Sequence, residues 1–292
     1  MSQVSYLCLD SPFASHPGTL YLLEPADAPQ GSLRARLLDE TYDKPFVLDD
    51  GEQRYLYFNV RLMQSAMDLK QPDALALRYT QKMMAFLLFK AKPKRLVILG
   101  LGGGSLVKFC YRRLPGTAVT AVELSPEVVA FRDLFLVPPD DERLSILNGD
   151  GAAYIEAVEK GIDVLLVDTF DKEGFAPELA GKAFFQAAYD KLSGSGILVV
   201  NLAGEHATYA GLVGRVMEVF DDQVIVISVP EDGNHMLYAF KTPYFDPRWR
   251  QLANQAKELK ARYGLDFPRF VEKMERAAKQ GIARRLQYGE YY

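Results

Sequence analysis

Four segments of the sequence carry residue types that could bind a small ligand and act on it. A cluster of glycines comes first along the chain, and each of the three later segments supplies one or two carboxylates. Each segment follows a run of aliphatic residues that is typical of a buried strand. The four segments are Gly100-Leu101-Gly102-Gly103-Gly104, Glu123, Asp150-Gly151 and Asp168-Thr169-Phe170-Asp171. Because open α/β sheets bind ligands at the carboxyl ends of their strands, near the point where the strand order reverses, the sequence predicts one site built from all four.

The glycine cluster lets the backbone approach a ligand closely, because glycine has no Cβ. As a dinucleotide fingerprint, G-x-G-x-x-G/A, the cluster is imperfect, since Ser105 stands where a third Gly or Ala belongs. A turn with a purely structural purpose is the alternative interpretation. The glycines by themselves leave the identity of the ligand open.

The carboxylates after the second and third strands favour an adenosine. Glu123 is placed to accept hydrogen bonds from both hydroxyls of a ribose. Asp150, in the segment "NGDG", is placed to accept a hydrogen bond from an adenine amino group, but it could also be the N-cap of the helix that follows. Taken in this order on successive strands, these residues indicate a nucleoside whose sulfur-bearing end lies over the glycines.

The carboxylates after the fourth strand could move a proton. Asp168 and Asp171 are three residues apart where that strand leaves the sheet. Neighbouring carboxylates raise the pKa of one another, so one of them can stay poised to accept a proton. Turn chemistry is the alternative, because Asp is favoured at strand exits for its local backbone hydrogen bonds.

The elements that position these residues fall into two parts. Residues 1–70 are predicted to form a small β-rich domain with strands at 18–24, 44–50 and 54–60 and no helix. The periodicity then changes, and residues 72–90 are predicted to form a helix with Pro72 in its first turn. This change predicts a boundary near residue 70, with a second domain over 71–292.

The second part alternates strand and helix patterns. Seven near-continuous aliphatic runs between residues 95 and 241 predict an α/β fold, a doubly wound and mostly parallel sheet with helices on both faces. The last two runs leave no room for a helix between them, so they are predicted to form an antiparallel hairpin at one edge. Two helices, separated by a break at "YGLDFP", are expected in the tail from Asp246.

Composition excludes several classes of partner. The 292 residues carry a formal net charge of −4, which argues against nucleic acid, and the basic stretch "MERAAKQGIARRL" is interpreted as a solvated helix face. We find no signal peptide, lipidation motif or long apolar run, so we expect a cytoplasmic protein without a membrane partner. The three histidines are scattered, so we expect no metal, and Cys110 lies in an apolar run and is expected to be buried and unreactive.

With these residues in place, the chain resembles the spermidine synthase family of aminopropyltransferases, which are built on the class I methyltransferase (Rossmann-like) sheet. The resemblance covers nearly the whole chain and includes "NVRLMQSAM", a helix carrying Tyr79, and the glycine, Glu, "GDG" and D-x-x-D segments in the family's order. It implies decarboxylated S-adenosylmethionine or S-adenosylmethionine as co-substrate, a small amine as acceptor and a homodimer. It also implies that Asp168 accepts the proton of the attacking amine, with Asp171 and Tyr79 beside the transferring group. The co-substrate would be held by Gln64, Gly100, Gly102, Gly103, Gly104, Glu123, Asp150 and Gly151.

Three departures from the family pattern affect this expectation. The family's loop has an aspartate where Gly103 stands here, and that aspartate disfavours the carboxylate of ordinary S-adenosylmethionine, so its loss should relax the choice of donor. Lys172 replaces the proline that follows D-x-x-D. Pro230 lies nearest to the position of the family's acceptor-pocket tyrosine, and the neighbouring Glu231 and Asp232 could attract a cationic acceptor or simply form a solvated turn.

Aminopropyl transfer, with methylthioadenosine as product, is therefore the leading hypothesis. Methyl transfer from S-adenosylmethionine on the same sheet is the alternative, and a non-catalytic nucleoside-binding protein is a further one. An NAD-dependent dehydrogenase is disfavoured, because Ser105 breaks the fingerprint and no partner for hydride transfer is apparent. The acceptor and the choice between the two donors stay open.

Overall fold

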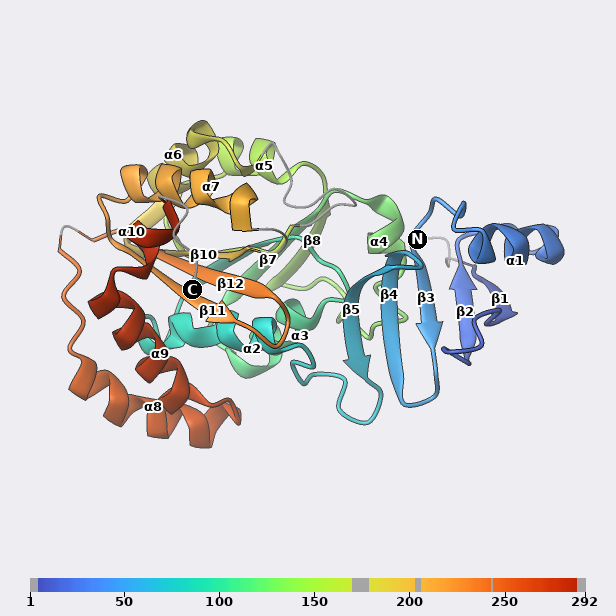
Figure 1. Ribbon diagram of the computed structural model, residues 1–292, viewed down its shortest axis with the longest axis horizontal. Helices are drawn as coiled ribbons and strands as arrows, with labels where there is room; N and C mark the ends of the chain where they lie inside the picture. Colours follow the sequence, from blue (N-terminus) through green and yellow to red (C-terminus); the bar gives the residue numbers. More distant parts are fainter. Residues whose placement is uncertain (1–4, 170–178, 203–205, 243, 288–292) are drawn as a thin grey trace.

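The computed structural model describes residues 5–169, 179–202, 206–242 and 244–287, which form two β-sheets and the helices around them (Figure 1). The first sheet is five-stranded and antiparallel, with its strands in chain order. They are β1 (Leu7–Asp10), β2 (Thr19–Leu22), β3 (Phe46–Asp49), β4 (Gln53–Asn59) and β5 (Leu62–Asp68). The three strands predicted in this region are therefore confirmed as β2, β3 and β4.

The expectation that residues 1–70 contain no helix is wrong. Helix α1 (Gln30–Leu38) lies between β2 and β3. Only Leu33 and Leu37, four residues apart, are buried on it, and they join the core cluster of β1–β3. Two apolar positions are too few for a convincing helical pattern, which explains why the sequence did not reveal it.

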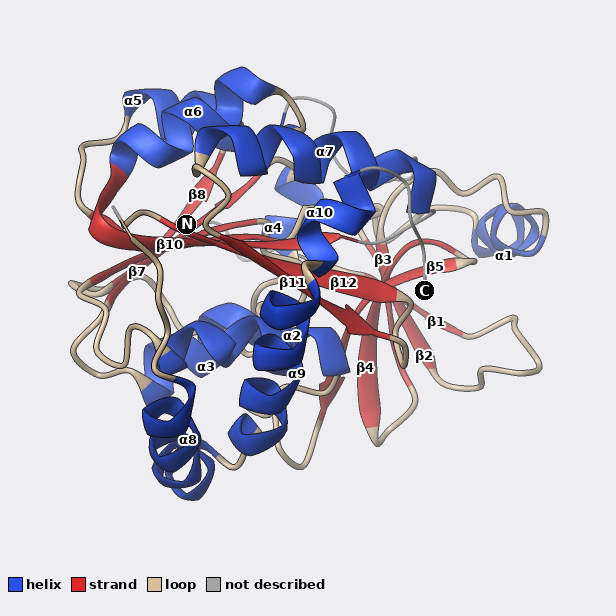
Figure 2. Ribbon diagram, turned by 60° about the vertical axis from the view of Figure 1, so that its left-hand side comes forward, coloured by secondary structure: helices blue, strands red, loops and turns tan. Residues whose placement is uncertain are grey.

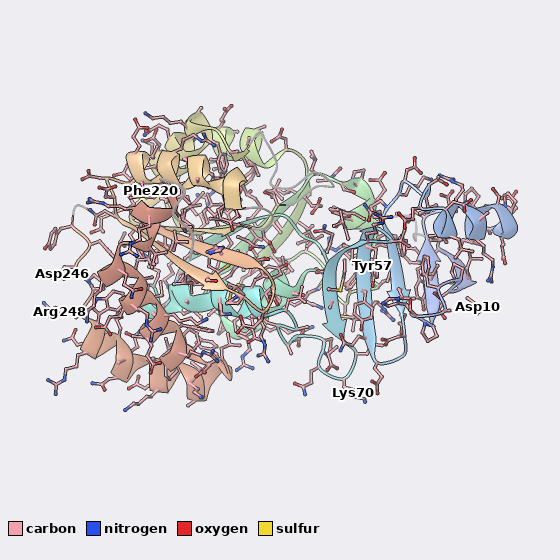
Figure 3. All side chains as sticks on the ribbon, in the orientation of Figure 1. Asp10, Tyr57, Lys70, Phe220, Asp246 and Arg248 are labelled. Atoms are coloured by element: carbon pink, nitrogen blue, oxygen red, sulfur yellow. The ribbon has the colours of Figure 1, made fainter. Side chains whose placement is uncertain are left out.

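The two sheets share part of their hydrophobic core. Val47, Leu56 and Met67 of the five-stranded sheet belong to the same buried cluster as strands and helices of the second sheet. Figure 3 places Tyr57, on the five-stranded sheet, and Phe220 toward opposite ends of the molecule. The division into domains at residue 70 stays a prediction.

The helix expected from Pro72 begins later. Helix α2 (Arg78–Met83) continues as a 3₁₀ helix, η1 (Met84–Leu88), and Leu77 before it is extended. The Ala74 N–H donates to the carbonyl of Gln71 in a turn, and Leu75 is buried from outside the helix. Pro72 therefore lies before the helix, in a segment that contains a turn. The apolar pattern alone does not reveal that the helix begins only at Arg78.

The second sheet has seven strands in the order β11-β12-β10-β9-β6-β7-β8. All neighbours are parallel except β12, which is antiparallel to both β10 and β11. The strands are β6 (Arg95–Leu99), β7 (Ala118–Glu123), β8 (Leu144–Asn148), β9 (Ile162–Val167), β10 (Leu192–Leu202), β11 (Val224–Val229) and β12 (Asn234–Phe240). The predicted α/β fold with an antiparallel edge hairpin is confirmed, and its strand order reverses between β6 and β9.

Helices cover both faces of this sheet (Figure 2). One face carries α5 (Gly151–Ala157), α6 (Lys182–Lys191) and α7 (His206–Val219), and the other carries α2, α3 (Ser105–Arg113), α8 (Trp249–Tyr263) and α9 (Phe267–Gln280). The short helices α4 (Pro126–Ala130) and α10 (Ile282–Gln287) complete the described part of the chain. None of the helices in this part is long and apolar enough to span a membrane.

Strand β10 begins directly after α6, at Leu192, and runs through the segment "SGSG" with a bulge opposite β9 before Ile197. One local expectation needs correction. The tail holds a third helix, α10, because Gly281 adopts the left-handed conformation that ends α9 and lets the chain turn.

Candidate active site

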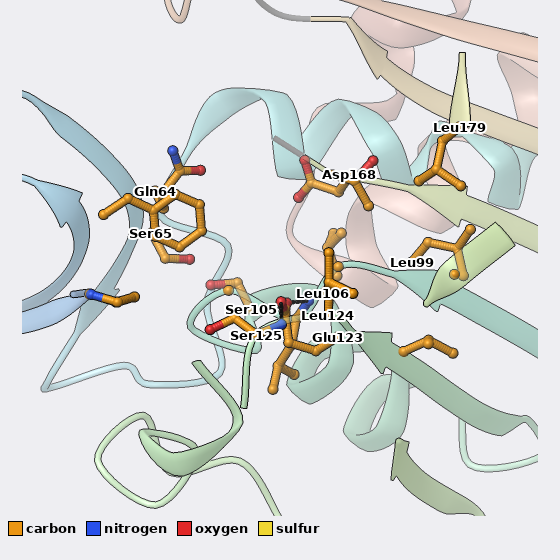
Figure 4. A pocket seen from close by; sticks show the side chains of 18 of the residues that line it. Gln64, Ser65, Leu99, Ser105, Leu106, Glu123, Leu124, Ser125, Asp168 and Leu179 are labelled. Carbon is orange, nitrogen blue, oxygen red and sulfur yellow. Dashed lines mark hydrogen bonds between the residues drawn. The ribbon is translucent and has the colours of Figure 1, made fainter. Parts of the chain in front are cut away.

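A pocket of about 600 Å³ lies at the carboxyl ends of β6, β7 and β9. Figure 4 shows Gln64 and Ser65 on one side of it and Asp168, Leu99 and Leu179 on the other. The predicted site residues that line it are Gln64, Tyr79, Gly100, Gly102, Glu123, Asp150, Gly151 and Asp168. The structure thus brings residues from six separate segments into one cavity at the predicted edge of the sheet. Asp171 lies outside the described residues.

The backbone conformation at position 100 requires a glycine independently of any ligand. Its φ of +94° is one that L side chains rarely adopt, and an added Cβ would lie 2.2 Å from the Asp168 carbonyl oxygen. The Asp168 N–H in turn donates to the carbonyl of Leu99 at 2.9 Å. The glycine therefore allows the exits of β6 and β9 to pass close together, which sets the position of Asp168.

Gly103 and Gly104 are not among the residues that line the pocket. An added Cβ at Gly103 would lie 2.8 Å from Phe135 Cδ1, and one at Gly104 would lie 2.3 Å from Val137 Cγ2. The Gly103 N–H donates to Ser65 Oγ at 3.0 Å, which ties the loop to β5. The Cβ of an aspartate at position 103 would meet the buried Phe135 ring. The substitution Gly103→Asp, which would restore the family's aspartate, would therefore disturb packing as well as the choice of donor.

Glu123 holds the glycine loop in place. The residue is only 9% exposed, and its carboxylate accepts the Leu101 N–H at 2.8 Å on Oε2 and the Ser125 N–H at 2.9 Å on Oε1. Each carboxylate oxygen can accept more than one hydrogen bond. The group can therefore fix two loops and still accept the hydroxyls of a ribose.

Asp150 is the N-cap of α5. Its Oδ1 accepts the N–H groups of Ala152 at 2.7 Å and Ala153 at 3.2 Å. The capping interpretation of this residue is confirmed, and its role toward a nucleoside stays a prediction. Because both bonds use the same oxygen, Oδ2 is left to face a ligand.

Asp168 follows β9 and carries two side-chain hydrogen bonds. Tyr79 Oη donates to Oδ2 at 3.2 Å, and Asn201 Nδ2 donates to Oδ1 at 2.8 Å. Burial raises the pKa of Asp168 to about 6, the bonds from Asn201 and Tyr79 oppose this rise, and the charge of Glu123 adds to it. Burial, followed by the charge of Asp168, raises the pKa of Tyr79, so its hydroxyl stays a donor. A carboxylate with a pKa near neutrality is suited to proton transfer.

The turn between β11 and β12 is bonded to α2 and is not a freely solvated turn. Asp232 Oδ2 accepts the Tyr79 N–H at 2.6 Å, and Glu231 pairs with the nearly buried Lys82 at 3.0 Å. Asp232 thereby holds the start of the helix that carries Tyr79. Both acids have structural partners, which weakens the idea that they attract an acceptor.

Sequence reasoning missed Asn201 and Asn234. Asn201 lies near the carboxyl end of β10, after the aliphatic run "ILVV", which is the same signal that selected Glu123. Asn234 begins β12 and donates a hydrogen bond to Asn201 on the adjacent antiparallel strand β10, so only the strand register reveals it. Cys110 is buried as expected, and burial raises the pKa of its thiol to about 12. Within the described ranges, no cluster of three His, Cys, Asp or Glu side chains could hold a metal ion.

The fold and the site together define the class of protein to which this chain belongs. The seven-stranded sheet with its antiparallel edge, the glycine loop at the switch point and the acid at the end of the next strand are those of a class I methyltransferase-like fold. Residues 76–252 match the spermine/spermidine synthase domain, and the chain belongs to the spermine/spermidine synthase family. The resemblance found in the sequence is thereby confirmed.

Individual relatives agree with this assignment. The polyamine aminopropyltransferase of Chromobacterium violaceum is 32% identical over 248 residues, which cover 85% of this chain and 95% of that protein. The crystal structure of a probable spermidine synthase from Corynebacterium glutamicum superposes with a TM-score of 0.62 at 22% identity, over 73% of this chain and 84% of that one. Human methyltransferase-like protein 13 in complex with SAH gives 0.59 at 21% identity, over 64% of this chain and 93% of that one. These two structures show a shared fold.

Proposed function

We propose that the protein is an aminopropyltransferase of polyamine biosynthesis. It moves an aminopropyl group from decarboxylated S-adenosylmethionine to a small amine and releases methylthioadenosine. Family membership supports this assignment, since the aligned relative from Chromobacterium violaceum is a polyamine aminopropyltransferase. The single observation that carries it is the Asp168 carboxylate, which lines the pocket with two hydrogen-bond donors on it and a pKa raised to about 6.

The donor occupies the pocket with its nucleoside toward Glu123 and Asp150. Glu123 accepts the ribose hydroxyls and Asp150 the adenine amino group, while Gly100 and Gly102 let the backbone approach the sulfonium end. Gln64 on β5 borders the same cavity from the opposite side. No metal takes part in this scheme.

The chemistry is a displacement at carbon. The amine nitrogen attacks the methylene carbon next to the sulfonium, a C–N bond forms, and the C–S bond breaks with its electron pair going to sulfur. An alkylamine is protonated at neutral pH and cannot attack until its proton leaves. Asp168 accepts that proton, Asp171 lies three residues further on to attract the cation, and Tyr79 keeps Asp168 oriented.

Product analysis tests this function against methyl transfer. The protein is given decarboxylated S-adenosylmethionine or S-adenosylmethionine, each with a panel of diamines and polyamines. We expect methylthioadenosine from the decarboxylated donor. S-adenosylhomocysteine as the only nucleoside product would replace the proposal with methyl transfer. Calorimetric binding of methylthioadenosine without turnover on any amine would favour a non-catalytic nucleoside-binding protein.

Replacing Asp150 separates its cap from its proposed contact with the nucleoside. Asp150→Ser keeps an N-cap side chain but loses the charge and the reach, whereas Asp150→Ala loses the cap as well, at about 1 kcal/mol of stability. We expect both variants to bind methylthioadenosine roughly ten- to a hundred-fold more weakly, and only Asp150→Ala to melt at a clearly lower temperature. Calorimetry and thermal melts measure the two effects. Parent-like affinity in Asp150→Ser would assign this residue to the cap alone.

A homodimer stays a prediction. The five-stranded sheet ends at β1 and β5, and a sheet edge is a surface that a second copy can cover.

A further inference from the structure

Two buried asparagines form a chain of hydrogen bonds that ends on Asp168. Asn201, at the end of β10, is 2% exposed, and Asn234, at the start of β12, is 7% exposed. Asn234 Nδ2 donates to Asn201 Oδ1 at 2.8 Å, and Asn201 Nδ2 donates to Asp168 Oδ1 at 2.8 Å. Buried amides without such partners would be costly, so their placement here calls for an explanation.

The direction of this chain follows from the charge of Asp168. An ionised carboxylate can only accept, so Asn201 must present its amide nitrogen to Asp168. The Asn201 oxygen then points to Asn234, which must in turn present its own nitrogen. Asn234 thus opposes rotation of the Asn201 amide, and a protonated Asp168 that donated its hydrogen to Asn201 would require both amides to turn.

We propose that Asn201, oriented by Asn234, is a positioning residue that holds Asp168 as an ionised, correctly aimed proton acceptor. The proposal rests on the proposed function for the role of Asp168. With Asn201 on Oδ1 and Tyr79 on Oδ2, each oxygen keeps a lone pair for the proton of the attacking amine. The two donors fix the carboxylate plane from two different elements, β10 and α2.

Other charged groups around Asp168 set the background for this effect. Glu123 at the end of β7 raises the pKa of Asp168, whereas the bonds from Asn201 and Tyr79 lower it. Asp150 lines the same pocket, and Asp232 accepts a hydrogen bond from the Tyr79 backbone N–H.

Further from Asp168, two groups are engaged elsewhere. Lys82 pairs with Glu231, and the His235 ring bonds Tyr209 Oη on α7 at 2.9 Å. Of the described groups in contact with the carboxylate, Asn201 and Tyr79 are the donors, so loss of Asn201 should let Asp168 take up a proton at higher pH.

The test is the pH dependence of kcat/KM for Asn201→Ser and for the double variant Asn201→Leu/Asn234→Leu. Serine is too short to reach Asp168, and the double variant removes both amides, so no buried amide of the pair is left without its partner. The parent's acid limb is expected near pH 6, with activity falling below it as Asp168 is protonated. Both variants should move that limb upward by about 1–2 pH units and keep most of the activity above it.

Two controls separate this role from general damage and from an error in the proposed function. Tyr209→Phe loses a buried hydroxyl contact to the residue after Asn234 and should leave the acid limb unchanged.

Carbon-13 carboxyl shifts of labelled aspartate, with Asp168 assigned by the loss of its signal in Asp168→Asn, follow the same titration without turnover. An upward shift of this titration supports the proposal even if the parent releases no methylthioadenosine. The absence of that product would overturn only the proposed function. Equal loss of activity at every pH, with an unmoved Asp168 titration, would overturn the role of Asn201.

Discussion

Asp168→Asn is expected to lower aminopropyl turnover by roughly 10²–10⁴-fold and to leave methylthioadenosine binding close to that of the parent. The substitution keeps the shape of the side chain and removes the group that accepts the amine's proton. The asparagine oxygen can still accept from Asn201, and its amide can donate to Tyr79 Oη, so the fold around β9 should be preserved. Single-turnover release of methylthioadenosine measures the chemical step apart from product release.

Asp163→Asn is the matched control for this substitution. Asp163 lies on the same strand but near its opposite end, where its carboxylate accepts the Lys94 N–H and pairs with Lys90. Its loss should lower stability and leave the rate per folded molecule unchanged. Parent-like release of methylthioadenosine by Asp168→Asn would remove this residue from the mechanism and assign removal of the amine's proton to another group.

The part of the site that the sequence predicts is the part that follows from strand ends. Glu123, Asp150 and Asp168 each follow an aliphatic run, and parallel strands carry such residues to one edge of the sheet whatever the loops do. Tyr79 and Gln64 came instead from the family resemblance, since nothing in their local pattern places them near Asp168.

What the sequence did not predict depends on packing between distant segments. The space beside Gly103 is closed by the Phe135 ring, which comes from a later segment of the chain. Asn234 reaches Asn201 only through the register of β12 on β10, and a one-residue slip would turn it to the other face. In the same way, α1 is stabilised by two leucines against a sheet and not by its own sequence pattern.

Glu123→Gln is expected to weaken methylthioadenosine binding by roughly ten- to more than a hundred-fold. The glutamine offers one oxygen where the carboxylate offers two. Either the Leu101 N–H or the Ser125 N–H therefore loses its acceptor, and a ribose hydroxyl loses its acceptor as well. A lower melting temperature should accompany the loss, because these two bonds fix the glycine loop. Glu127→Gln is the matched control, since this acid lies on the neighbouring helix α4 and its contact is to the Ser125 hydroxyl.

A ligand lacking a ribose hydroxyl separates direct contact from movement of the loop. If Glu123 accepts the 2′-hydroxyl, the parent should bind 2′-deoxy-methylthioadenosine more weakly than methylthioadenosine by about the factor that Glu123→Gln costs. In Glu123→Gln the two ligands should bind almost alike, because the partner of the hydroxyl is gone and the two changes are not additive. A full difference between the ligands in the variant would mean that another residue accepts the hydroxyl. Glu123 would then act on binding only through the Leu101 and Ser125 N–H groups that it holds.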